Sequence, residues 1–428
     1  MKRKRDSFDR IRICVATSYA ATAEPRAPRY TAELARLDPR FEITFVDCVP
    51  RGQRAVTPIE FDGLANVTHR TWYFPWRQAG QLSLLAEKIR QYSARLAFQW
   101  FGTPKKEGLS TRSIGLEEIL KAEGADLYFG FNIDALLPVY RAAQANGAPF
   151  LFDCQEVYAE MAHPQTKIER EMIRAIQRQC LPSCALVLAA SPQAADFIER
   201  EYAIRNVLSL FNAPPTEELP VPDAKDEFSL YWRNGTIDLG PRGLDDALRA
   251  MALLPAGIVL YLQGRPAMDS GKRVEQLIHE LGIQERVIVL PPYRSQDAVR
   301  VAAPYSVGLS LESPARINLD LTASNKFFDY AMAGLAIVST RTEGLRHLIE
   351  SEQLGLVYDP GDHADLARQI LHLYNDRPLL HAMRRNARAY ALREGNLEFQ
   401  MNRFREVFCQ RVLQLPGLGH NDAEGVPK

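Results

Sequence analysis

Short apolar runs alternate with longer amphipathic stretches along most of this chain, and this alternation limits the folds open to it. The short runs are typical of buried strands, and the stretches between them have helical spacing. This order predicts parallel sheets with right-handed helical crossovers. The expected strands are residues 11–17, 41–48, 67–72, 126–131, 149–154, 185–190 and 207–211, followed by 228–232, 258–263, 287–290, 306–311, 336–340 and 355–358.

The chain has 428 residues, which suits two domains of roughly 200 residues better than one core. A segment rich in Pro, Asp and Glu, residues 212–227, separates the two series of strands and is the expected linker. We expect an α/β protein with two doubly wound Rossmann-like domains, 1–211 and 228–395, which face each other across a cleft. Ligands of such domains bind at the carboxyl ends of the strands.

Composition excludes several classes of protein. Lys and Arg together number 52, as do Asp and Glu, and this zero net charge argues against a nucleic-acid partner. The six cysteines lack zinc-site spacing and predict buried free thiols in a reducing cytosol. No apolar run approaches membrane-spanning length, and residues 10–18 are expected to form the first strand and not part of a leader. The predicted location is the cytoplasm.

A helix with an exposed start is predicted after Ser324, which is a suitable N-cap residue. The first backbone N–H groups of that helix would favour an anion such as a diphosphate. Asp329 lies about one turn after Asn325, and its carboxylate can accept hydrogen bonds from the two hydroxyls of a ribose. Gly334 supplies the left-handed position that ends the helix. Together these features predict a nucleotide-diphosphate site.

The segment Asn325-Lys326-Phe327-Phe328-Asp329-Tyr330, followed by Ala333-Gly334, resembles the donor helix of retaining glycosyltransferases of the large family 4. The stretches 230–235 and 242–244, 258–264, and 281–293 resemble other parts of the same domain in the same order. The resemblance is dense from about residue 228 to residue 408. It implies two Rossmann-like domains of the GT-B type, a helix over 396–414 that crosses back to the first domain, and a loose tail over 415–428.

The resemblance also implies donor-binding residues in the second domain. Its phosphate loop corresponds to Gly235, Arg242 and Gly243, and an arginine there can hold a diphosphate and stabilise the leaving group. The family often has a second cation where Thr236 stands, so Arg233 or Arg265 is expected to replace it. The family's first acidic residue corresponds to Leu321, and Asp320 or Glu312 could substitute for it. Further implied contacts are Gly264, Tyr293, Asn325, Lys326 and Asp329.

In the first domain the match is altered at two positions. Gln155 stands where the family has a histidine, and Phe131-Asn132 replaces a His-Asp pair. An amide can orient a hydroxyl but cannot accept a proton near neutral pH. In this family the departing phosphate is thought to act as the base, so Gln155, Glu156 and Arg242 are the predicted catalytic residues. For Glu156 a helix-capping role is the structural alternative.

The expected function is metal-independent transfer of a sugar, with retention, from a UDP- or GDP-sugar to a hydroxyl of a glycan or lipid-linked acceptor. No cofactor is expected, because neither metal-ligand spacing nor a pyridoxal-anchoring lysine segment is evident. The alternative is a nucleotide-sugar-binding pseudo-glycosyltransferase that serves as a partner subunit. The altered positions Phe131, Gln155 and Leu321 motivate it.

One further segment admits two interpretations. The aromatic cluster at residues 72–77 precedes a stripe in which apolar residues recur every three or four positions, with basic residues beside them. We expect this stripe to pack a helix on the first sheet. The alternative is peripheral contact with the inner face of a membrane. The stripe is Leu82, Leu85, Ile89, Tyr92, Leu96 and Trp100.

Overall fold

The structure is a computed structural model, and it describes residues 10–74, 81–110, 112–161, 166–219, 228–267, 271–416 and 418. The chain divides into two compact units. The first unit comprises residues 1–190, 195–210 and 401–428, and the second comprises 191–194 and 211–400. Each is described by itself below.

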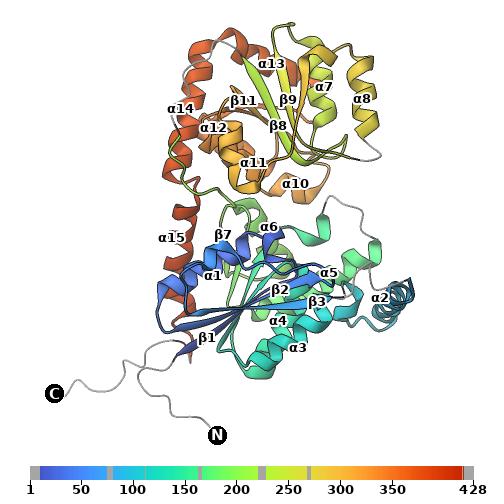
Figure 1. Cartoon of the computed structure of the whole chain (residues 1–428), viewed down its shortest axis with the longest axis vertical. Helices are drawn as coiled ribbons and strands as arrows, with labels where there is room; N and C mark the ends of the chain where they lie inside the picture. Colours follow the sequence, from blue (N-terminus) through green and yellow to red (C-terminus); the bar gives the residue numbers. More distant parts are fainter. Residues whose placement is uncertain are drawn as a thin grey trace, which may run out of the picture. The chain divides into compact units, whose positions relative to one another are not determined.

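The first unit contains a seven-stranded parallel sheet in the order β3-β2-β1-β4-β5-β6-β7 (Figure 1). Apolar residues occupy both faces of its central strands, because helices cover both sides of the sheet. Its strands are β1 (Ile11–Thr17), β2 (Phe41–Pro50), β3 (Val67–Phe74), β4 (Leu127–Phe131), β5 (Phe150–Cys154), β6 (Leu186–Ala189) and β7 (Val207–Ser209).

The helices of this part of the chain lie between its parallel strands in sequence. They are α1 (Arg26–Leu37), α2 (Gln81–Phe101), α3 (Arg112–Glu123), α4 (Ile133–Asn146), α5 (Lys167–Cys180) and α6 (Pro192–Tyr202).

The second unit contains a six-stranded parallel sheet in the order β10-β9-β8-β11-β12-β13. Its strands are β8 (Ser229–Ile237), β9 (Val259–Pro266), β10 (Val287–Leu290), β11 (Val307–Ser310), β12 (Ala336–Thr340) and β13 (Gly355–Tyr358). Its helices are α7 (Leu244–Leu253), α8 (Gly271–Glu280), α9 (Ala298–Ala302), α10 (Ile317–Leu321), α11 (Asn325–Met332), α12 (Glu343–Ser351), α13 (His363–Asn375) and α14 (Arg377–Arg393).

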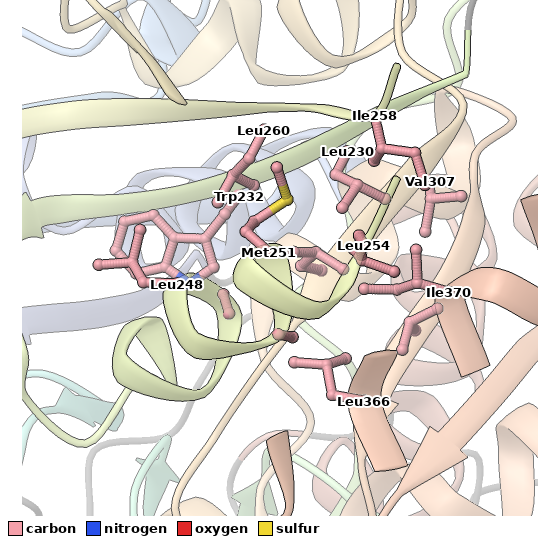
Figure 2. Packing of buried hydrophobic residues seen from close by; sticks show 14 of the residues in the cluster. Leu230, Trp232, Leu248, Met251, Leu254, Ile258, Leu260, Val307, Leu366 and Ile370 are labelled. Atoms are coloured by element: carbon pink, nitrogen blue, oxygen red, sulfur yellow. The ribbon is translucent and has the colours of Figure 1, made fainter. Parts of the chain in front are cut away.

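A hydrophobic core fixes α7 and α13 against one face of this second sheet. Figure 2 shows Trp232 and Leu230 of β8 in one cluster with Met251 of α7 and Leu366 of α13. Trp232 is fully buried, and its indole N–H donates to the carbonyl of Arg242 at 3.1 Å. The core therefore holds the loop after β8 as well as the strand.

The last helix, α15 (Leu397–Val407), begins in the second unit and enters the first at Met401. Phe404 packs on Tyr30 with ring centroids 4.8 Å apart, and Phe408, in the helical turn Phe408–Val412, packs on Phe41 at 6.2 Å. Both phenylalanines are fully buried. The predicted crossing back to the first domain is confirmed.

All thirteen predicted strands are present, so the predicted fold class is confirmed. The largest difference in extent is in β8, which continues to Ile237 through an irregular register between Arg233 and Thr236. Gly235 thus lies within the strand and not in a loop after it. Among the helices that the structure describes, none is long and apolar enough to cross a bilayer.

The prediction that the apolar stripe of α2 packs on the sheet is wrong for most of its residues. Leu85, Ile89, Tyr92 and Trp100 are exposed. The inner side of α2 is instead made by small or partly polar residues such as Ala94, which is buried. Residues 75–80 of the neighbouring aromatic cluster, and the side chains of residues 81–84, lie outside the described part of the chain.

Candidate functional site

Strand order in the second sheet reverses between β8 and β11, which extend the sheet in opposite directions. Such a switch point leaves space at the carboxyl ends of the two strands, because their following segments turn to opposite faces. Arg233 lies in β8 where its register becomes irregular, and Glu312 lies just after β11. The other charged residues of the candidate site gather around these two.

Arg233 pairs with Asp329, the acidic residue of the predicted donor helix. The same guanidinium donates to the Tyr293 hydroxyl at 2.7 Å, and its backbone N–H donates to the Tyr330 hydroxyl at 3.1 Å. Arg233 and Asp329 are both largely buried. The structure therefore brings Asp329 and Tyr293 together through an arginine that the sequence suggested only as a substitute cation.

Glu312 joins two further cations. One of its carboxylate oxygens accepts from Arg242 at 2.6 Å, and the other lies 2.9 Å from the ammonium of Lys326. Lys326 also donates to the carbonyl of Leu311 at 3.2 Å. Glu312 is almost fully buried, so its negative charge is compensated within the protein by these two cations.

Burial lowers the pKa of Lys326 from its ordinary value to about 8. Glu312 opposes this shift, and the positive charge of Arg242 adds to it. Lys326 can therefore lose its proton within the range in which enzymes operate. A bound anion would favour the charged form.

The three glycines predicted at the site differ in their surroundings. Gly243 has φ +65°, and a Cβ there would lie 2.4 Å from the Leu311 Cβ. A Cβ on Gly264 would lie 2.4 Å from the carbonyl oxygen of Asn234. Gly235 is exposed, with nothing within 4 Å of its ideal Cβ. Gly243 and Gly264 thus have packing reasons to be glycine, whereas Gly235 has space for a ligand.

The donor helix α11 begins at Asn325 as predicted, with Ser324 at the N-cap in extended conformation. The Ser324 side chain makes no capping hydrogen bond, and Asn325 is exposed. The first turn of this helix therefore presents Asn325 outward while Lys326 and Asp329 point into the charged cluster. Gly334 has φ +74°, which confirms its predicted left-handed role at the helix end.

The structure distinguishes between the alternative acidic residues and between the alternative arginines that the sequence left open. Glu312 lies in the cluster, whereas Asp320 accepts from the backbone N–H of Glu343 at 3.0 Å at the start of α12. Arg233 lies in the cluster, whereas Arg265 is an exposed residue near the end of β9. Glu312 and Arg233 are therefore the substitutes that the structure brings to the other predicted residues.

A second polar cluster lies at the carboxyl ends of β1, β4 and β5 in the first unit. Arg26 pairs with Asp153 at 2.7 Å, and both side chains are buried. Asn132, which follows β4 with φ +69°, accepts from Thr17 at 2.9 Å and donates to Glu24 at 3.1 Å. Burial raises the pKa of Glu24, although the hydrogen bond from Asn132 opposes this shift.

The predicted first-unit residues meet this cluster in part. Gln155 follows β5 and lies near the Glu24 and Asp153 carboxylates, but its amide nitrogen is buried without a hydrogen-bond partner among the residues that the structure describes. Glu156 is half-buried, and the next helical turn begins later with Val157 as its N-cap residue, so the structure does not give Glu156 the capping role. Phe131 is fully buried beside Tyr30 and offers no polar group.

Sequence reasoning did not single out Glu24 or Arg26. Both follow the first strand after a short segment rich in alanine, and charged residues just beyond the carboxyl end of a parallel strand are candidates for a site. Their position just after the first strand was the sequence signal that could have identified them. Within the described residues, no group of three or more His, Cys, Asp or Glu side chains is arranged to hold a metal ion.

Part of the chain that contains this site is similar to a known protein family. Residues 235–376, which include Arg242, Lys326 and Asp329, match the family model described as Glycosyl transferases group 1. Comparison with curated protein sequences finds no match.

Several solved structures share the fold at low identity. Sucrose-phosphate synthase from Thermosynechococcus elongatus is 16% identical with a TM-score of 0.72, over 94% of this chain and 99% of that one. HepE from Anabaena, in complex with UDP, is 14% identical with a TM-score of 0.63, over 94% and 100%. WaaG, a glycosyltransferase involved in lipopolysaccharide biosynthesis, is 15% identical with a TM-score of 0.62, over 93% and 99%.

The chain therefore has the two-domain GT-B fold of glycosyltransferases. Its second unit carries the sequence signature of the group 1 glycosyl transferases, and the cluster around Glu312 lies within it.

Proposed function

We propose that this protein is a retaining, metal-independent glycosyltransferase that uses a UDP- or GDP-sugar. The observation that carries the proposal is the cluster of Arg233, Arg242 and Lys326 around Asp329 and Glu312 at the switch point of the second sheet. Three cations and two carboxylates leave one excess positive charge at the place where parallel sheets bind nucleotides.

Three members of the cluster have roles suited to their chemistry. Arg242 and Lys326 would hold the diphosphate and stabilise the charge that develops as the sugar leaves. Asp329 would accept hydrogen bonds from the ribose, and Tyr293 would contact the base. The donor phosphate would receive the acceptor proton, so the protein need not supply a titrating base there.

The acceptor is proposed to be a hydroxyl of a glycan or of a lipid-linked glycan. The amide nitrogen of Gln155 is buried near Glu24 and Asp153 without a hydrogen-bond partner in the described part of the chain, which supports a role in donating to a substrate hydroxyl at the carboxyl edge of the first sheet. A protein of the same fold was solved with UDP-glucose, which makes UDP the first nucleotide to test.

A second candidate, a nucleotide-sugar-binding pseudo-glycosyltransferase, is favoured by one observation. Phe131 fills core space beside Tyr30, and Gln155 cannot titrate, so the first unit lacks both imidazoles of the family pattern. Such a subunit would bind the nucleotide sugar without consuming it.

The test combines binding and turnover. Asp329→Ala should weaken UDP or GDP binding by about one to two orders of magnitude, because a charge-assisted hydrogen bond contributes roughly 1.5–3 kcal/mol. Calorimetric titration measures the affinity. Glu352→Gln, which removes the exposed ion pair with Arg393, is the matched control and should bind normally.

Turnover then separates the two candidates. Wild-type protein incubated with a panel of nucleotide sugars should release free nucleotide, with or without EDTA. Binding without release supports the pseudo-enzyme, and activity that requires added Mg²⁺ or Mn²⁺ contradicts metal independence. Unchanged affinity in a folded Asp329→Ala variant would remove the donor-site assignment itself.

A further inference from the structure

The exposed face of α2 is apolar along most of the helix. Leu85, Ile89, Tyr92 and Trp100 are 54%, 59%, 66% and 80% exposed. Their spacing of three, four and eight residues places them on one side, which rises about 22 Å at 1.5 Å per residue. Helices on globular proteins ordinarily turn such a stripe toward the core, so this orientation is reversed.

The opposite side of α2 fixes this orientation. Arg95 pairs with Glu169 of α5 at 2.6 Å and donates to the carbonyl of Gly108 at 2.9 Å. Ala94 is buried, and a Cβ on Gly108 would contact its methyl group at 3.7 Å. Figure 1 shows α2 at the rim of the first unit. The helix is thus held by its polar and small residues, and its apolar side is left outward.

Exposed basic residues flank the apolar stripe. Lys88 and Arg90 are exposed on α2 itself, and Lys105 is exposed shortly after it. The one acidic residue within α2, Glu87, is only partly exposed. The chain as a whole is neutral, so this positive charge is local.

An apolar stripe between basic residues matches an anionic lipid surface, where lysine and arginine contact headgroups and large apolar side chains enter the acyl boundary. A second copy of the chain matches it less well, because two such faces would bring like charges together. We do not expect the apolar stripe to face only solvent, because a contiguous exposed apolar surface usually marks an interaction site.

We propose that α2 binds the first unit to an anionic lipid surface, with the helix lying parallel to the membrane plane. Leu85, Ile89, Tyr92 and Trp100 enter the interface, and Lys88 and Arg90 contact the headgroups. The proposal rests on the first unit alone and does not depend on sugar transfer by the second.

The experiment measures binding of the full chain to vesicles of phosphatidylcholine, with or without phosphatidylglycerol, by flotation. Wild-type protein should float with the vesicles that contain phosphatidylglycerol, and its tryptophan emission should shift to shorter wavelength. Leu85→Glu combined with Ile89→Glu should abolish both effects. The matched control, Leu253→Glu with Leu392→Glu, adds the same charge at exposed leucines in the second unit and should bind like wild type.

A second pair of changes tests the charge. Lys88→Gln with Arg90→Gln should weaken binding to phosphatidylglycerol vesicles by roughly tenfold or more, because each basic residue near such a surface contributes about 1 kcal/mol. Added salt should weaken wild-type binding in the same direction.

Three results would overturn the proposal. The first is that the wild type does not float with vesicles, and the second is that the Leu85 and Ile89 changes leave flotation unaffected. The third is that the wild type does not bind vesicles but self-associates in sedimentation, and that the same changes abolish this self-association. The last result would assign the face to a second copy of the chain. Circular dichroism of each variant checks that α2 still folds.

Discussion

At the scale of single residues, the candidate site depends on charges that compensate one another before any ligand arrives. Asp329 is engaged by Arg233, and Glu312 by Arg242 and Lys326. These buried pairs keep long side chains in place, which lowers the ordering cost of binding an anion. The charge of Lys326 responds to pH just above neutrality, because burial has lowered the pKa of its ammonium group to about 8.

Nucleotide affinity should therefore fall as pH rises above about 8, by up to about tenfold per pH unit, because binding favours the protonated lysine. The free energy of unfolding should move the other way. Between about pH 8 and 10.5 the unfolded chain binds more protons at Lys326 than the folded chain, so this group's contribution to stability rises with pH.

Titration of UDP across this range by calorimetry checks the prediction. Lys326→Gln should bind more weakly near neutral pH but lose the decline above pH 8. A decline that persists in Lys326→Gln would assign the titration to another group.

Gln155 offers a second residue-scale prediction, in the first unit. If its amide orients the acceptor hydroxyl, Gln155→Ala should lower kcat by about tenfold or more with nucleotide affinity nearly unchanged, as expected of a contact that strengthens in the transition state. Steady-state kinetics together with UDP titration separates the two effects. Gln155→His should retain or gain activity, whereas wild-type kinetics in both variants would remove Gln155 from the site.

At the scale of elements, the loop after β8 is held by a close approach to β11. Gly243 caps α7 in a left-handed conformation, and its α-carbon faces the side chain of Leu311. That contact aligns Arg242 with Glu312, so the backbone and the ion pair support the same geometry.

Gly243→Ala should lower the free energy of unfolding by roughly 2–4 kcal/mol, from the left-handed backbone and the clash with Leu311 together. Gly235→Ala, its matched control, has room for the methyl group and should leave stability unchanged or slightly higher. Denaturant unfolding measures both. If Gly235 lies beside the diphosphate, its variant should still lose UDP affinity, and full retention would exclude that contact.

The strands could be predicted because each is a short apolar run whose burial depends little on its partners. The extent of β8 could not, because its continuation past Arg233 follows from pairing with β9 around an irregular register. The orientation of α2 was predicted wrongly because amphipathic spacing defines a face without saying what covers it. Arg26 and Asp153 are 127 residues apart, so their pairing arises only from the sheet order.

At the scale of the whole molecule, the first unit depends on the end of the chain. Phe404, Phe408 and Val412 are fully buried in or beside its core, although they follow the whole of the second unit in sequence. Replacing a buried phenylalanine such as Phe404 or Phe408 with alanine lowers the free energy of unfolding by roughly 3–5 kcal/mol.

A chain that stops after Gln400 should therefore lose the folded first unit and keep UDP binding by the second. Limited proteolysis should degrade the first unit of this truncated chain, and calorimetric titration should detect unchanged UDP affinity. A chain that stops after residue 416, which retains these three residues, is the control. Protease resistance of the first unit in both chains would contradict this account.

The path of α15 also orders events during protein synthesis. A ribosome releases the strands of the first unit early, yet the aromatic side chains that complete its interior emerge last. The second unit, almost continuous over residues 211–400, is exposed in full before then and can close on its own. The part of the protein made first is thus the part finished last, and a nascent chain stalled before Phe404 would carry an apolar opening in its first unit for chaperones to cover.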